Sequence, residues 1–360
     1  MIRLVSVLTV MLLSACGSSS PKPQAEVTSG LASQEEALSQ WLDEYPADTA
    51  FTLLLASASG ARYQHSSGES TADTLYESAS TSKLVTATVI MTLVEDGTLS
   101  LSDHPQDYIS AWPTTGNLAA ITLQQLLNFT SGLSEAPLCQ NNGLADFTNC
   151  VLAIADDNDS SVTPGSEYYY ASTHLQVAGL MALNAAINAG SLDEGSDWND
   201  LFAAFKTRFG LFSHSTYDLP SASNPRLAGG MHWSGNDYMA FLQALYQGDI
   251  VSATALSSMR TDYLGSATIT YSPAAEVGAS WHYGNGLWLE SCDGSQSDCI
   301  SQRISSPGAY GAYPFIDFEL GYWGLLARQG SLGTFADGYE LMTSARTMLD
   351  NWAALAADGD

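Results

Sequence analysis

Ser80 and Lys83 are the residues whose types and spacing most directly suggest chemistry. They stand three positions apart at the start of a long apolar stretch, and residues i and i+3 share one face of a helix. A serine hydroxyl is a weak nucleophile until a neighbouring base takes its proton. A lysine can be that base when burial keeps its amine neutral. The pair therefore predicts a nucleophile and its base on the first turn of a helix.

The Ser-x-x-Lys spacing is not specific by itself. Ser19 and Lys22 have the same spacing inside a Ser- and Pro-rich segment that is typical of a flexible linker. A lysine at a helix start commonly packs its stem on apolar neighbours and keeps its ammonium in water. Lys83 differs because residues 84–94 are strongly apolar, which predicts a buried helix that ends at Gly97.

The composition limits the possible classes of protein. The chain has 360 residues, of which 45% are hydrophobic, so it can bury a substantial core in one large domain or two lobes. It carries 38 acidic residues against 11 Lys and Arg, a formal net charge of −27, which argues against a nucleic-acid partner because phosphate binding needs basic side chains. The histidines are scattered and no Cys-x-x-Cys spacing occurs, so we expect neither a metal site nor a cofactor.

The N-terminus is similar to a bacterial lipoprotein signal. Residues 1–15 have a short basic start, an apolar stretch too short to remain in a membrane, and the sequence Leu-Ser-Ala before Cys16. This likeness implies cleavage before Cys16 and lipidation of its thiol, with residues 16–30 as the tether; an ordinary signal with an incidental cysteine is the alternative. We therefore expect a protein anchored by lipid to a membrane of the cell envelope. Gly17 favours the outer membrane, facing the periplasm, or the cell surface.

The other four cysteines form two close pairs, Cys139 with Cys150 and Cys292 with Cys299. An exported protein meets an oxidising compartment, where thiols form disulfides. Four cysteines allow three connectivities, and two local disulfides are the simplest of them. Each bond would stabilise the fold by about 2 to 3 kcal/mol.

Strand patterns lie at both ends of the chain and helical patterns in its middle. The expected strands are residues 51–56, 62–65, 283–289, 309–316 and 322–327, and the expected terminal helices are 31–45 and 338–356. Residues 80–190 are expected to be mainly helical except for a loop around 139–150, with further helices over 198–209 and 236–248. This order predicts an α+β fold in one domain, residues 31–360, with a mixed sheet from both chain ends and a helical lobe over about 80–235.

Several ordered segments resemble the serine beta-lactamase and penicillin-binding protein superfamily, in particular its class C-like beta-lactamases, DD-peptidases and family VIII esterases. The segments are residues 77–103 with Ser80-Thr-Ser-Lys83, residues 121–133 ending in Thr-Ser-Gly-Leu, residues 164–172 beginning with Pro-Gly, residues 224–230 and residues 283–288. The resemblance implies a beta-lactamase/transpeptidase-like fold with an antiparallel sheet. It also implies chemistry that passes through an acyl-enzyme.

The resemblance assigns roles to individual residues. It implies that Ser80 is acylated, that Lys83 is its partner and that Tyr170 moves protons. We expect the lysine to stabilise the Tyr170 phenolate enough for it to act as a base; the alternative is a core aromatic within the Tyr168–Tyr170 cluster. The expected oxyanion donors are the backbone N–H groups of Ser80 and Ala309.

Two positions depart from the family pattern. Ser172 stands where an asparagine is usual, and Ser306 stands where a lysine or histidine usually begins the third motif, here Ser306-Pro307-Gly308. Ser172 can still orient Lys83 or a substrate carbonyl through its hydroxyl. Gly308 fits a strand that lets a substrate approach closely.

The missing cation at position 306 shapes the expected function, because relatives use that cation to hold a substrate carboxylate. Arg303, His232 and His282 stay open as other sources of positive charge. We predict a serine hydrolase that acts on an ester or amide, in a small molecule or peptide, as an esterase or DD-peptidase-like enzyme before a beta-lactamase. The alternative is a noncatalytic penicillin-binding-like sensory or binding lipoprotein.

Overall fold

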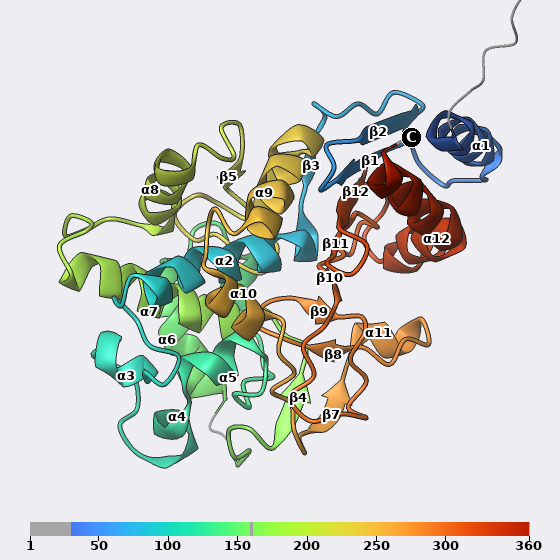
Figure 1. Cartoon of the computed structure of the whole chain (residues 1–360). Coiled ribbons are helices and arrows are strands. Elements are labelled where there is room, and N and C mark those ends of the chain that lie inside the picture. Colours follow the sequence, from blue (N-terminus) through green and yellow to red (C-terminus); the bar gives the residue numbers. More distant parts are fainter. Residues whose placement is uncertain (1–29, 159–160, 360) are drawn as a thin grey trace, which may run out of the picture.

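The computed structural model describes residues 30–158 and 161–359 (Figure 1). The predicted signal at residues 1–15, the predicted lipidation site Cys16 and most of the tether lie outside these residues. Within the described residues, no helix is both long and apolar enough to cross a membrane.

The largest sheet within the described residues has seven strands and joins the two ends of the chain. Its order is β2-β1-β12-β11-β10-β9-β8, and all its pairings are antiparallel. The strands are β1 (Phe51–Ser57), β2 (Arg62–Ser67), β8 (His282–Tyr283), β9 (Trp288–Leu289), β10 (Arg303–Ser305), β11 (Tyr313–Asp317) and β12 (Tyr322–Arg328). Because β1 pairs with β12, with Phe51 opposite Arg328, the predicted sheet from both chain ends is confirmed.

Helices cover both faces of this sheet. The terminal helices α1 (Gly30–Glu44) and α12 (Phe335–Asp358) pack together on one face, and α9 (Gly235–Gln247) packs on the other (Figure 1). Successive side chains of a strand point to opposite faces, so Leu53 joins the core beneath α1 and α12 while Leu54 joins the central core. Burial on both faces explains why β1 is buried along its whole length and is mostly apolar instead of alternating with polar residues.

The middle of the chain forms the helical half of the fold. Its central element is α2 (Ser82–Glu95), which is buried from Ser82 to Leu93 and contacts α7 (Thr173–Asn188). The other elements are α3 (Pro105–Tyr108), α4 (Gly116–Ala120), α5 (Leu123–Leu127), α6 (Phe147–Asp157), α8 (Trp198–Phe209), α10 (Ala253–Met259), α11 (Pro273–Glu276), and the 3₁₀ helices η1 (Ala79–Thr81) and η2 (Leu138–Asn141).

Two small sheets connect the halves of the molecule. One has the order β3-β6-β5, formed by β3 (Leu75–Glu77), β6 (Met231–Ser234) and β5 (Thr216–Tyr217). The other pairs β4 (Glu167–Tyr169) with β7 (Thr268–Tyr271) in parallel. The first leads into the nucleophile helix, and the second ends beside Tyr170.

Three of the predicted elements were wrong in detail. Residues 283–289 form a hairpin of β8 and β9 instead of one strand, because Gly286, at φ 78°, turns the chain. The strand predicted at 309–316 begins only at Tyr313, after a turn. The loop predicted around 139–150 ends earlier, since Asp146 caps α6 by accepting from the Asn149 N–H and places Cys150 in the helix.

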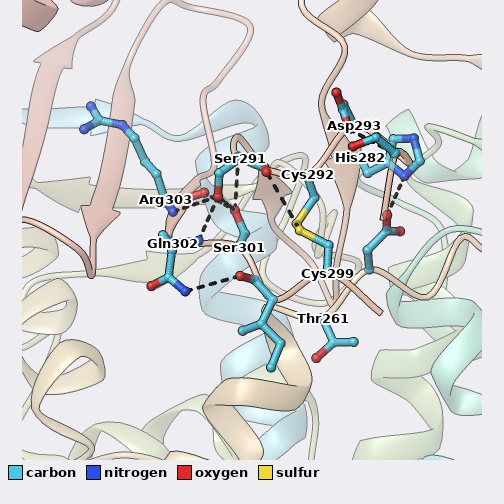
Figure 2. Close-up of a disulfide and its surroundings, with 12 residues drawn as sticks. Thr261, His282, Ser291, Cys292, Asp293, Cys299, Ser301, Gln302 and Arg303 are labelled. Carbon is cyan, nitrogen blue, oxygen red and sulfur yellow. Dashed lines mark hydrogen bonds and ion pairs between the residues drawn. A yellow bond between two sulfur atoms is a disulfide. The ribbon is translucent and has the colours of Figure 1, made fainter. Parts of the chain in front are cut away.

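Both predicted disulfides are present. Cys139 is bonded to Cys150 and Cys292 to Cys299. Figure 2 shows the second bond beside Ser291 and Ser301, whose hydroxyl oxygens lie 2.8 Å apart. This bond closes the connection between β9 and β10, and the first closes the segment between η2 and α6.

Candidate active site around Ser80

Ser80 is presented by a sharp change from strand to helix. β3 ends at Glu77, and Ala79 adopts a φ of 42° before α2 begins, a conformation that is uncommon for a residue other than glycine. Thr81 fixes the turn from both sides, because its hydroxyl donates to the Ser78 carbonyl at 2.9 Å and accepts from the Trp233 indole N–H at 2.7 Å. Ser80 remains partly exposed and lines a cavity.

Lys83 lies one turn further along, as its spacing predicts. Only 4% of the residue is exposed, and Nζ lies 2.7 Å from Ser80 Oγ and 2.8 Å from the Ala228 carbonyl oxygen. None of the ion pairs within residues 30–158 and 161–359 involves Lys83. Burial, with a smaller contribution from the Arg226 guanidinium, lowers the pKa of Lys83 from 10.5 to about 7.

Tyr170 is enclosed by aromatic rings. Its ring stacks on Trp288 at 5.2 Å between centroids and meets the edges of Phe129 and Tyr283 at 5.5 and 5.8 Å. The amine of Lys83 lies over the same ring, 4.7 Å from its centroid.

The surroundings of Tyr170 oppose the expected phenolate. Burial raises the pKa of Tyr170 above its ordinary value of 10, and a side-chain hydrogen bond with Ser80 only partly opposes this rise. These surroundings therefore favour the neutral phenol at Tyr170.

A buried histidine supports this arrangement from behind. His174 Nε2 donates to the Tyr169 carbonyl at 2.9 Å, and Nδ1 accepts from the Ser131 hydroxyl at 2.8 Å. Its ring stacks on Phe129 at 4.8 Å. Burial lowers the pKa of His174 to about 4, so the imidazole is neutral and fixes the backbone next to Tyr170.

The segment from Ser306 to Ala309 lies against Ser80. The Ser306 hydroxyl donates to the Ser80 carbonyl at 3.0 Å, so it holds the backbone of Ser80. A Cβ at Gly308 would lie 2.7 Å from the Ser78 carbonyl oxygen, closer than any side chain tolerates. The N–H of Ala309 has no acceptor among the described residues, which leaves it available to the cavity.

This segment lies beyond β10 and not within a strand. Two bonds nevertheless continue the hairpin between β10 and β11, from Ser306 N–H to Pro314 O at 3.2 Å and from Gly308 N–H to Ala312 O at 2.9 Å. The segment is therefore held in register although Pro307 cannot donate.

Ser172 lines the cavity and is held by a residue that the sequence did not single out. Its hydroxyl donates to Gln140 Oε1 at 2.6 Å. Gln140 is 2% exposed, and its Nε2 has no partner among the described residues. It directly follows Cys139, so the first disulfide fixes the segment that carries it. The structure directs the Ser172 hydroxyl to Gln140 instead of to Lys83.

The cavity has a volume of about 320 Å³. It is lined by Ser80, Tyr170, Ala171, Ser172, Tyr271, Pro273, Glu276, Trp288, Pro307, Gly308, Ala309, Gly333 and Phe335. Across residues 30–158 and 161–359, no group of three or more His, Cys, Asp or Glu side chains is placed to hold a metal ion.

The three other candidate cations do not line this cavity. Arg303 is buried and reaches Glu290 and Asp317, each at 3.1 Å. His232 lies 2.6 Å from Asp218, and His282 lies 2.7 Å from Asp262. The carboxylate partners of these side chains lie elsewhere in the fold, so none of the three replaces the cation that Ser306 lacks.

Sequence reasoning missed the residues that enclose the site. Trp288 lies in residues 283–288, one of the segments that resemble the family, yet only the structure shows that it stacks on Tyr170. Ala228 lies in another such segment and contributes a carbonyl, which every residue type carries. Gln140 and Glu276 have no sequence signal, because their relevance depends on the packing of distant segments.

Comparison with known proteins adds to this geometry. The family model described as "Beta-lactamase" matches residues 53–326. The chain belongs to the beta-lactamase family. The matched range contains Ser80, Lys83, Tyr170 and the Ser306–Ala309 segment, and it excludes all of α1 and all of α12.

Individual relatives are more distant. Protein flp of Staphylococcus aureus is 29% identical over 119 residues, which is 31% of this chain and 23% of that protein, so the match spans less than a quarter of the curated relative. A beta-lactamase-like protein from Bacteroides dorei has a TM-score of 0.73 and 25% identity, covering 90% of this chain and 100% of its own. The hydrolase EstCE1, with promiscuous acyltransferase activity, has a TM-score of 0.66 and 17% identity over 90% and 98% of the chains. These matches confirm the predicted fold class.

Proposed function

We propose that the chain is a serine hydrolase that acts through an acyl-enzyme on ester or amide substrates. The observation that carries this proposal is the 2.7 Å contact between Lys83 Nζ and Ser80 Oγ, in surroundings that bring the pKa of Lys83 to about 7. Near neutral pH a large share of the amine is unprotonated, so its lone pair can take the Ser80 proton. Membership of the beta-lactamase family and fold neighbours such as EstCE1 and a D-amino acid amidase support the same reaction class.

The first half-reaction forms the acyl-enzyme. Ser80 Oγ attacks the substrate carbonyl carbon as Lys83 accepts its proton, and the resulting oxyanion lies between the N–H groups of Ser80 and Ala309. Loss of one such donor typically raises a barrier by about 2.7 to 4 kcal/mol. The neutral Tyr170 then gives its phenolic proton to the leaving group and is reprotonated from Lys83. The leaving group departs as an alcohol or amine, and Ser80 carries the acyl group.

The second half-reaction uses the same groups in reverse order. Water attacks the acyl carbonyl and gives a proton to the amine of Lys83, which then returns one to Ser80 Oγ as the acid departs. The raised pKa of Tyr170 and the lowered pKa of Lys83 suit these roles, because groups whose pKa values are pushed apart can serve as acid and base in one site.

The surroundings favour substrates without a carboxylate next to the scissile bond. No residue that lines the cavity is Lys, Arg or His, and the Ser306 hydroxyl is engaged by Ser80 O. Beta-lactams and D-Ala-D-Ala peptides carry such a carboxylate, so we rank simple esters and amides above them.

The test combines turnover with covalent labelling. We expect the chain to hydrolyse p-nitrophenyl acetate faster than nitrocefin and to be labelled by a fluorophosphonate probe, with both properties lost in Ser80→Ala. Nitrocefin turnover far above ester turnover would reverse the substrate ranking. Absence of turnover and of labelling by both the fluorophosphonate and fluorescent penicillin would favour the noncatalytic binding lipoprotein.

We also propose that the chain is anchored to the cell envelope through lipid on Cys16. The support is the signal-like sequence of residues 1–15 with its Leu-Ser-Ala-Cys site. Expression in a Gram-negative bacterium fed a clickable palmitate should label the protein and place it in the membrane fraction. Cys16→Ser should abolish both, and label retained by this variant would disprove the anchor.

A further inference from the structure

The parallel pairing of β4 with β7 brings two segments to the same side of the cavity. Parallel strands run in one direction, so the residues that follow them emerge at the same end. Tyr170 to Ser172 follow β4, and Ser272 to Glu276 follow β7, with the Tyr170 N–H donating to the Tyr271 carbonyl at 3.1 Å. Both segments line the cavity that contains Ser80.

The first segment offers the cavity an acceptor. A hydroxyl has one proton, and that of Ser172 is given to Gln140 Oε1. Their separation of 2.6 Å lies within the usual range of an O–H···O bond and below that of an N–H···O bond, so Gln140 faces Ser172 with its oxygen. The remaining lone pairs of Ser172 Oγ can only accept.

The second segment offers a negative charge. Glu276 is exposed on α11 and lines the cavity, with the Tyr271 hydroxyl 3.5 Å from its Oε1. None of the ion pairs found among the described residues engages this carboxylate. The other walls are largely apolar, formed in part by Trp288, Phe335 and Pro273. A charged substrate therefore meets a carboxylate and, among the residues that line the cavity, no cation.

We propose that this subsite selects substrates that carry a protonated amine, with Glu276 as the residue that determines the preference and Ser172 as a second acceptor. The inference rests on the proposed hydrolase function and names its substrate class. The net charge of −27 acts in the same direction, because it raises the local concentration of cations and repels anions. The apolar walls hold the hydrocarbon that carries the amine.

The experiment compares esters that differ in charge and little in shape. One series places the charge in the acyl group, as the p-nitrophenyl esters of 6-aminohexanoate (cationic), heptanoate (neutral) and adipate (anionic). The other places it in the leaving group, as 2-(dimethylamino)ethyl thioacetate, which is protonated at neutral pH, and isopentyl thioacetate. The measured quantity is the ratio of kcat/KM for the cationic ester to that for the neutral ester, at pH 7 and low salt.

In at least one series, we expect the wild type to favour the cation by about three- to fivefold, as for an exposed charge pair. Glu276→Gln should lower this ratio by the same factor, and Glu276→Lys should make the anionic ester the better substrate of the acyl series. Glu194→Gln is the matched control, because it removes one exposed negative charge on the loop between α7 and α8. This control should leave the ratio unchanged.

The outcomes separate the two proposals. If the neutral esters are hydrolysed by wild type and not by Ser80→Ala, the hydrolase function stands. The amine preference is then overturned when neither series favours the cation, or when Glu194→Gln lowers the ratio as much as Glu276→Gln. If no ester of either series is hydrolysed, the proposed function and the preference that rests on it both fail.

Discussion

Replacing Lys83 by methionine should stabilise the fold while removing turnover. The buried ammonium opposes folding, because the pKa of Lys83 falls from 10.5 to about 7. At about 1.36 kcal/mol for each pKa unit, this difference corresponds to about 4 to 5 kcal/mol near pH 7. Methionine avoids that cost but leaves Ser80 Oγ and Ala228 O without their partner, which opposes the gain by about 1 to 3 kcal/mol. We therefore expect the free energy of unfolding to rise by about 1 to 4 kcal/mol at pH 7.

The stabilisation by Lys83→Met must also decrease as the pH rises. Between pH 7 and 10.5, Lys83 binds a proton in the unfolded chain and not in the folded one. Wild-type stability therefore gains with rising pH in this window, by up to about 1.36 kcal/mol per pH unit from this group. Below pH 7 the cost of burying the ammonium is fully present. The advantage of Lys83→Met should shrink by about 2 kcal/mol between pH 7 and pH 9.

Guanidinium denaturation, followed by tryptophan fluorescence at pH 7 and pH 9, measures the difference in the free energy of unfolding between wild type and Lys83→Met. Other titrating groups are common to both proteins and cancel in the difference. Lys206→Met is the matched control for the loss of a lysine, because Lys206 is only partly buried and donates to the Ser215 carbonyl at 3.1 Å. If the difference in the free energy of unfolding between wild type and Lys83→Met stays constant from pH 7 to pH 9, Lys83 is not neutral in the folded protein. It then cannot be the base that takes the Ser80 proton.

Three further expectations follow from the same structure. The kcat/KM for p-nitrophenyl acetate should rise with pH through a midpoint near 7, as Lys83 loses its proton; a flat pH–rate profile from 5.5 to 8.5 would contradict this. Arg303→Met should lower the free energy of unfolding by about 3 to 5 kcal/mol in guanidinium denaturation, since it leaves the buried Asp317 without its ion-pair partner and Glu290 with Arg346 alone, and kcat/KM at 20 °C should be retained. Changing Cys139 and Cys150 together to serine should cost about 2 to 3 kcal/mol of stability and reduce kcat/KM, because the bond holds the segment that supports the cavity.

The sequence predicted those features of the fold and the site that follow from local spacing and local composition. The i, i+3 spacing places Lys83 Nζ at Ser80 Oγ, and the apolar stretches at both chain ends pair as β1 and β12. It failed where distant segments set the environment of a residue. Tyr170 was expected to ionise more easily beside a lysine, but rings from distant segments, Phe129 and Trp288 among them, enclose it, and burial raises its pKa instead.

The same limit applies to the polar contacts of the site. Ser172 was expected to orient Lys83 or a substrate, and the residue that takes its proton, Gln140, lies 32 positions earlier in the chain. The sequence showed that Ser306 stands where relatives carry a cation. It could not show the hydrogen bond from Ser306 to the Ser80 carbonyl, because the two residues are 226 positions apart. No local pattern encodes such pairs, whereas the glycines of residues 283–289 could have indicated the hairpin.

The two departures from the family pattern act on different parts of the site. Ser306 removes the positive charge while still supporting the nucleophile through its backbone, so the acylation chemistry does not depend on the lost cation. Ser172 lacks the amide donor of an asparagine, and its only proton is given to Gln140, so toward the cavity it can only accept. In the proposed subsite, with Glu276 as the charged residue that lines the cavity among the described residues, both substitutions would shift selection in one direction, away from carboxylates and toward amines. A hydrolase that kept its nucleophile and base could therefore acquire a new substrate class through positions that contribute little to the barrier of proton transfer.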